Sequence, residues 1–410
     1  MLCLMYLIAY IDRQNVSYAK LEMVDALGLT EAAYGLGASL FFLGYFLFEA
    51  PANMILAKVG ARLWFARIMG SWAIVTIALG FTQNATMFYI LRFLLGVAEA
   101  GFFPGVLFVL TLWYPQARRA QMVGWFMIAS AGANAVGSLI GGALLGLDGA
   151  AGLAGWQWVF IATGIPAILL VPVVLLRLPS RPAEARFLSE EEKGWLAAEL
   201  AGEPGIRHVD GPAWRVIFDP RVLLLAALYF AMPLGAYGLS YWLPTIVKEF
   251  GASNLENGII NVIPWICVAL ALWAVPNHAS RHGASRWHIV GPMLIGAAAL
   301  LCSVIVPGAA VKFAFLCVAA AAIFSAQPVF WSVPQRLLTG AHAAAGLAAI
   351  NSIGNLGGFV AQTVVPAIKQ ATGSDILPML FPAVCLMIAA ALVFVVLPQL
   401  SRAPIRDVRA

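Results

Sequence analysis

Long apolar runs separated by short polar breaks recur along the whole 410-residue sequence. Hydrophobic residues make up 62% of the chain and charged residues 10%, whereas a soluble domain has about 45–50% apolar and about 25% charged residues. A water-soluble fold has too little interior to bury so much apolar side-chain surface. The composition therefore excludes a soluble enzyme, a disordered chain and a nucleic-acid-binding protein.

The apolar runs predict twelve membrane-spanning helices, because about 20 apolar residues cross a bilayer. The expected spans are 2–19, 33–56, 64–82, 86–112, 121–147, 157–178, 221–247, 257–277, 287–306, 311–333, 344–368 and 377–398. We expect an all-α membrane protein with one six-helix bundle at 1–178 and a second at 219–399. Between them, 179–218 is predicted to be a cytoplasmic linker whose capping-box pattern at 189–192 begins a short surface helix. Residues 400–410 are expected to form a cytoplasmic tail.

The distribution of lysine and arginine predicts the orientation in the membrane. Of 24 such residues, 18 fall in the even-numbered connections and the tail, two lie inside spans, and the opposite side holds only Lys20, Lys248, Lys312 and Lys369. Positive residues are enriched on the cytoplasmic side. We therefore expect both termini on the cytoplasmic side of a bacterial-type inner membrane. We also expect the protein to be a monomer surrounded by lipid.

A short pattern repeats in corresponding loops of the two halves. The segment 58–64 follows the second span, and a similar order of basic residue, glycine, alanine, basic residue and tryptophan recurs at 281–287. Internal repeats of this kind place a substrate site at the interface between the halves. The pattern favours a duplicated architecture with a central site.

Five charged residues lie inside predicted spans, all in the first half: Asp12, Arg13, Glu49, Arg92 and Glu99. A charged group in a span costs about 2.5–3.5 kcal/mol on insertion scales and usually marks function. A carboxyl group in a low-dielectric environment is more easily protonated, and a nearby arginine opposes this. An anionic substrate that binds the arginine would link its binding to protonation. Structural ion pairs are the alternative interpretation of these charges. For Glu49 we favour a structural role, in which it bonds neighbouring helix ends.

The second half offers uncharged polar and aromatic residues in its predicted spans. Asn351 and Asn355 lie on one face of the eleventh span, Gln327 and Trp331 are one turn apart on the tenth, and Tyr237 lies on the seventh. With Tyr45 of the second span, they are candidates for a hydrogen-bonding wall opposite the charged one. Buried amides also join helices without binding ligand.

Other chemistries lack their residues in this sequence. The five histidines have no metal-ligand spacing within a span, so no metal or other cofactor is expected. A phosphate-binding glycine-rich loop and an activated nucleophile with its base are also missing. The sequence therefore favours neither an ATP-driven pump nor a membrane enzyme.

Several stretches resemble the major facilitator superfamily, and within it the anion:cation symporter family. The resemblance is carried by 10–16, 44–53, 92–105, 155–158, 330–334 and 351–359 and extends over essentially the whole chain. It implies the major facilitator fold of two pseudo-symmetric six-helix bundles. It also implies proton-coupled uptake of small carboxylates such as sugar acids, tartrate, phthalate or hydroxyphenylacetate.

The resemblance further assigns roles to single positions. Asp12 and Glu99 match the acids that couple transport to protons, and Arg92 matches a residue that interacts with the coupling acid. Positions that match Arg13, Tyr45, Trp331 and Asn351 line the substrate site. From the residues alone we add Arg92, Tyr237, Gln327 and Asn355 to this site.

Two loop positions depart from the pattern of the superfamily. Ala57 and Ser280 stand where acidic residues usually latch the outward-facing state on the cytoplasmic side. The loss implies an altered conformational bias or reduced transport, with the central site intact. We expect a proton symporter that imports a small organic anion and uses the proton gradient as its energy source. A uniporter or exporter of organic anions, or a membrane sensor that does not transport, are the alternatives.

Overall fold

The computed structural model describes residues 1–201, 213–283, 285–338, 340–374 and 376–400, which are helical with short connections and contain no strand. The first half comprises α1 (Leu2–Ala26), α2 (Glu31–Val59), α3 (Ala61–Leu79), α4 (Ala85–Glu99), α5 (Phe102–Trp113), α6 (Gln116–Leu145) and α7 (Gly155–Arg177). The linker holds α8 (Glu190–Ala201). The second half comprises α9 (Pro220–Glu249), α10 (Asn254–Ile260), α11 (Val262–His282), α12 (Trp287–Ile305), α13 (Ala309–Leu337), α14 (Gly340–Thr372) and α15 (Leu377–Leu400).

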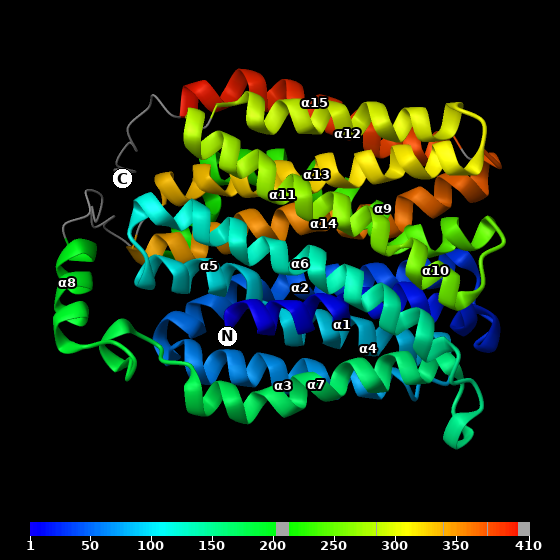
Figure 1. Cartoon of the computed structure of the whole chain (residues 1–410), viewed down its shortest axis with the longest axis horizontal. Coiled ribbons are helices and arrows are strands. Elements are labelled where there is room, and N and C mark those ends of the chain that lie inside the picture. The colour runs from blue at the N-terminus through cyan, green and yellow to red at the C-terminus, as the bar shows by residue number, and fades with distance from the viewer. Residues whose placement is uncertain (202–212, 284, 339, 375, 401–410) are drawn as a thin grey trace.

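The helices agree with a twelve-span membrane protein. Within the described residues, ten helical stretches are long and apolar enough to cross a membrane. α1 and α14, which carry more polar residues, are of similar length and lie among them (Figure 1). Counting α4 with α5 and α10 with α11 as one span each gives the expected twelve.

The fourth span is not the continuous helix that we expected at 86–112. α4 ends at Glu99, and Gly101 has a left-handed φ of 88° before α5 begins. A side chain at Gly101 would also collide with Ala52 of α2, so this position requires glycine for its backbone and for its packing. The break places Glu99 at the end of a helix, next to an irregular turn.

The eighth span is also divided, at Asn261. The short helix α10 begins with a capping box in which Ser253 and Glu256 bond each other's backbone. The side chain of Asn261 then donates to the carbonyl oxygen of Asn257 at 2.9 Å. This polar step separates α10 from α11 inside what the sequence predicted as one apolar run.

The two halves form bundles that meet along a few helix pairs. In the first bundle α1 packs on α6 and α7, and α2 packs on α4, while in the second α9 packs on α14 and α12 on α13. Contacts between the bundles are made mainly by α2 with α14 and by α6 with α10 and α11. Figure 1 shows the spanning helices side by side, with α8 at one end of the molecule and α10 at the other.

The linker helix begins as its sequence predicts. The Ser189 backbone N–H donates to Glu192 Oε2 at 2.8 Å, and the Glu192 N–H donates to Ser189 Oγ at 3.2 Å. This reciprocal bonding satisfies two backbone donors at the start of α8. Residues 202–212 and the tail at 401–410 lie outside the described residues, so the remainder of the predicted linker and tail is not assigned a structure.

Candidate functional site

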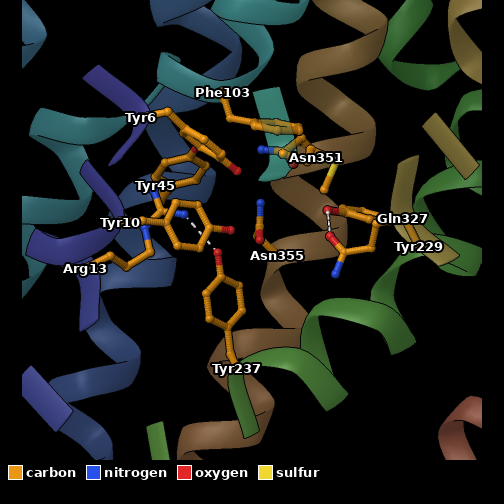
Figure 2. Close-up of a pocket in the computed structure, with 11 residues that line it drawn as sticks. Tyr6, Tyr10, Arg13, Tyr45, Phe103, Tyr229, Tyr237, Gln327, Asn351 and Asn355 are labelled. Atoms are coloured by element: carbon orange, nitrogen blue, oxygen red, sulfur yellow. Dashed lines mark hydrogen bonds between the residues drawn. The ribbon is translucent and has the colours of Figure 1, made fainter. Parts of the chain in front are cut away.

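A small polar cavity lies between the bundles, midway along the spanning helices. Its volume is about 20 Å³, which is room for roughly one water molecule. The lining side chains come from both halves and are mostly tyrosines and amides (Figure 2): Tyr6, Tyr10, Arg13, Tyr45, Phe103, Met127, Tyr229, Tyr237, Gln327, Asn351 and Asn355. Among these lining side chains there is a single positively charged group.

Arg13 is that group, and its contacts join the two halves. Its Nη2 and Nε donate to Glu99 Oε2 at 2.6 and 3.2 Å, which places this ion pair within the first bundle. Its Nη1 donates to the hydroxyl oxygen of Tyr237 on α9 at 2.8 Å. Both ends of the guanidinium are thus held by hydrogen bonds, and one of them depends on the second bundle.

Aromatic rings surround the rest of the guanidinium. Its carbon lies 5.5 Å from the ring centre of Tyr10, 5.1 Å from that of Phe41 and 5.3 Å from that of Tyr45. Cations are attracted to ring faces at such distances, and the attraction grows when water is excluded. The rings hold Arg13 at the cavity.

Asp12 points away from Arg13 into the first bundle. Its Oδ2 accepts from Thr76 Oγ1 at 2.5 Å and its Oδ1 from Asn15 Nδ2 at 3.2 Å. Asn15 also donates to Thr163 on α7. The adjacent residues 12 and 13 therefore have separate environments, an enclosed polar network for the acid and the cavity for the arginine.

Arg92 does not bond Glu99, although the two residues lie two turns apart on α4. Glu99 is bonded to Arg13, whereas Arg92 Nη2 donates to the carbonyl oxygen of Ala38 at 3.1 Å, and its guanidinium lies over Phe41 at 5.0 Å. Both side chains are buried. Arg92 is not among the described residues that line the cavity, so it supports the site from behind.

The wall supplied by the second bundle is neutral. Figure 2 shows Tyr237, Asn355 and Gln327 converging on the cavity, where the Tyr229 hydroxyl donates to Gln327 Oε1 at 3.4 Å. Trp331 lies behind this wall, fully buried, with its ring 4.9 Å from Tyr229. Trp331 therefore does not line the cavity. It packs against a lining residue, Tyr229, and holds it in place.

Glu49 joins the bundles on the side of the cavity nearer α8. Asn351 Nδ2 on α14 donates to Glu49 Oε1 on α2 at 2.6 Å, across 302 residues of sequence. Both side chains are buried, and Asn53 Nδ2 donates to the Glu49 carbonyl oxygen one turn further along α2. The carboxylate that we assigned to bonding between neighbouring helix ends thus bonds the opposite bundle.

The seam between α2 and α14 is close-packed through small residues. A side-chain carbon placed on Gly35 would collide with the carbonyl oxygen of Gln362, and one placed on Gly358 would collide with the Phe42 ring. Together with the Glu49–Asn351 bond, these contacts run along the facing helices at three levels. Any separation of the bundles must open this seam.

Sequence analysis did not identify Tyr6, Tyr10, Phe103, Met127 and Tyr229 as lining residues. Two of them had a signal, because Tyr6, Tyr10 and Arg13 follow the i, i+4, i+7 spacing of one helix face. The Tyr6 and Tyr10 ring centres are 4.7 Å apart. For the others, position on an apolar helix gives no sign of which face meets the cavity.

The arrangement can bind an anion with polar substituents. One arginine supplies charge and paired N–H donors, a geometry suited to a carboxylate, and the phenols and amides supply neutral donors and acceptors. Within the described contacts of the site, Glu99 is the one acid bonded to the arginine, and the neutral hydroxyl of Tyr237 accepts from its Nη1. Within the residues that the structure describes, no group of three or more His, Cys, Asp or Glu side chains could hold a metal ion.

A polar cavity between two membrane-spanning helical bundles is typical of a secondary transporter. The family model of the Major Facilitator Superfamily matches residues 2–362. A bacterial homologue of the lysosomal transporter Spinster, in an inward-facing and unoccupied conformation, superposes with a TM-score of 0.75 at 18% identity, covering 98% of this chain and 96% of that one.

Curated relatives agree with the structural match. The chain is 45% identical over 398 residues to a protein of Agrobacterium vitis named "Putative tartrate transporter", covering 96% of this chain and 88% of the relative. It is 43% identical over 406 residues to a "Quinolone resistance transporter" of Acinetobacter baumannii, covering 98% and 93%. The chain belongs to the Major Facilitator Superfamily and is a multi-pass integral membrane protein.

Proposed function

We propose that this protein is a proton-coupled symporter that imports a small organic carboxylate by alternating access. The observation that carries the proposal is that one guanidinium, Arg13, bonds Glu99 inside its own bundle and Tyr237 in the other. A relative named as a tartrate transporter supports a hydroxylated carboxylate as the substrate class. We place both termini in the cytoplasm, because most lysines and arginines lie in the connections on the same side of the membrane as the termini, and positive residues are enriched on the cytoplasmic side.

Competition for Arg13 links protons to substrate. While Glu99 is ionised, it occupies the Nε and Nη2 donors, which a substrate carboxylate would also use. Protonation of Glu99 removes the ion pair and leaves these donors for the substrate. Return of the proton to the cytoplasm restores the pair and expels the anion. Asp12, which is bonded to Thr76, is the second acid in this cycle.

Substitutions at three positions test the coupling in proteoliposomes. We expect Glu99→Gln to bind and exchange substrate in counterflow, but to lose accumulation driven by a pH gradient, because an amide cannot release a proton. Arg13→Gln should lose both. Glu191→Gln on the exposed start of α8 is the matched control and should retain both. Proton-driven accumulation by Glu99→Gln and Asp12→Asn at the wild-type level would contradict the coupling.

Export is the second candidate, and the relative named as a quinolone resistance transporter favours it. The same Arg13–Glu99 competition can run in the opposite direction, so that an inward proton displaces an outgoing anion. Loading vesicles with substrate and imposing a proton gradient separates the two. Symport predicts that substrate and protons move in one direction, and exchange predicts opposite directions.

A further inference from the structure

A second and larger cavity opens at the end of the molecule opposite α8. Its volume is about 620 Å³, within the range of about 300–1,000 Å³ that is common for small-molecule sites. The walls are mainly apolar, with Ile246, Phe250, Leu316 and Met379 among them. This vestibule, as we call it, belongs chiefly to the second bundle, with α1 and α2 at one side.

Three ammonium groups from three helices reach the vestibule: Lys20 of α1, Lys312 of α13 and Lys369 of α14. Glu31 and Glu249 are the two acids of its lining. Lys20 pairs with Glu31 at 2.9 Å, and Lys369 lies 3.8 Å from Glu249. The lining therefore has an excess of one positive charge.

Lys312 contributes that excess. It has no ion-pair or hydrogen-bond partner within the described ranges, and it is partly buried beside the apolar wall. A cation beside apolar surface matches a ligand that combines an anionic group with an apolar body. The vestibule thus differs from the central cavity, whose lining is mostly phenols and amides.

The vestibule and the central cavity lie along the same helices. On α9, Thr245 of the vestibule follows Tyr237 of the cavity by eight residues, or about 12 Å. On α1, Lys20 follows Arg13 by seven residues, which is two turns on one helix face. An anion that moves from the vestibule toward the cavity therefore passes from Lys20 to Arg13.

A closed layer separates the two spaces. The ring centres of Phe42 and Tyr237 are 4.8 Å apart, and Gln362 Nε2 donates to the Tyr237 carbonyl oxygen at 3.3 Å. Phe42 also abuts Gly358 of α14. Phe42 of α2 thus meets Tyr237 of α9 and Gly358 of α14, both in the second bundle, so separation of the bundles at this level would connect the vestibule with the cavity.

We propose that the vestibule is an entry site that holds an organic anion with an apolar body, with Lys312 binding its anionic group, before the anion reaches Arg13. The proposal rests on the proposed function for the direction of movement, but the binding site stands on its own lining. The ligand class is a small aromatic or aliphatic carboxylate. A lipid with an anionic headgroup shares this chemistry, and the experiment distinguishes the two.

Binding of 9-anthracenecarboxylate to the full chain in zwitterionic lipid nanodiscs tests the site directly, with empty nanodiscs and neutral 9-anthracenemethanol as the background. We expect Lys312→Gln to weaken binding about fivefold and Lys312→Arg to restore it. Lys248→Gln removes a charge at the same end, on a lysine bonded to Asn254, and should leave binding unchanged. An equal effect of Lys312→Gln and Lys248→Gln would overturn the site.

The Arg13→Gln variant separates this proposal from the proposed function. It should abolish transport and leave probe binding unchanged, because the vestibule is intact. Loss of all probe binding in Arg13→Gln would overturn a second site. If wild-type protein binds the probe through Lys312 but shows no counterflow, the vestibule stands and the proposed function fails.

Two further measurements test the assigned occupant. In uptake at low ionic strength, Lys312→Gln should raise KM about fivefold with kcat unchanged, and an unchanged KM would overturn the entry role. Nanodiscs that contain anionic phosphatidylglycerol should bind the probe as zwitterionic ones do. Displacement of the probe by this lipid would overturn the assignment and identify a lipid headgroup as the occupant.

Discussion

The bond between Glu49 and Asn351 predicts how firmly the bundles close on the α8 side of the cavity. It joins α2 to α14 at 2.6 Å between two buried side chains, and it can exist only while the seam is closed at this level. A hydrogen bond to an ionised group contributes about 1.5–3 kcal/mol to stability. Glu49→Leu should therefore shift the equilibrium toward the state open on the α8 side by roughly 10- to 150-fold.

Spin-label distances measure that equilibrium. Labels at Val59 on α2 and Leu223 on α9, both exposed, report separation of the bundles at the α8 end in a background without the native cysteines. We expect the long-distance population to grow in Glu49→Leu. Glu49→Gln keeps an acceptor for the Asn351 amide and should shift the population less.

A double-mutant cycle with Asn351→Leu decides whether the effect belongs to this contact. Removing one partner leaves the other buried and unsatisfied, whereas replacing both with apolar groups can be nearly neutral. The double variant should therefore be less open than the sum of the two single shifts predicts. Additive shifts, or an unchanged distance distribution in Glu49→Leu, would refute the reasoning.

Three other contacts give separate predictions. Tyr237→Phe removes the acceptor that orients Arg13 and should raise KM several-fold in counterflow, with the saturated rate unchanged. Gly358→Val drives a side chain into the Phe42 ring; overpacking costs about 1–3 kcal/mol, so the melting temperature in detergent should fall. Glu184→Ala breaks an exposed ion pair between the linker and Arg62 of α3, which contributes at most about 1 kcal/mol, so uptake should stay within about twofold of wild type.

The twelve spans could be predicted because hydropathy depends on composition alone, but the breaks within them could not. The interruption after Glu99 depends on Gly101 meeting Ala52 of another helix, and a single sequence does not contain that approach. The polar step at Asn261 likewise depends on a bond to Asn257 within an apolar run. Spans follow from average properties, whereas breaks follow from particular contacts.

The charged residues of the site could be predicted because, like the spans, they follow from composition. Charges are rare inside apolar runs, so Arg13 and Glu99 could be selected without knowing the packing. Their partners could not be selected, because nothing in the sequence indicates that Glu99 bonds Arg13 of α1 while Arg92 bonds the Ala38 carbonyl oxygen of α2. Pairing between helices depends on rotations that no periodicity encodes.

The described ion pairs within the membrane bundles follow one rule, and it bears on how the protein moves. Arg13–Glu99 and Lys20–Glu31 lie within the first bundle, and Lys369–Glu249 lies within the second. Across the interface, Arg13 and Glu49 instead meet the neutral side chains of Tyr237 and Asn351.

Because the ion pairs lie within the bundles and not between them, separation of the bundles costs less free energy. Breaking a buried ion pair costs about 3–5 kcal/mol, because a charge is left without its counterpart. Breaking a hydrogen bond between a charged and a neutral group costs about 1.5–3 kcal/mol. Water that enters the opened seam can then replace the neutral partner. Arg13 therefore keeps Glu99 as its counterpart as the bundles rock, and under the proposed function it is proton transfer to Glu99 that frees Arg13. A proton-coupled transporter needs this arrangement, because movement of the bundles alone then cannot separate Glu99 from Arg13.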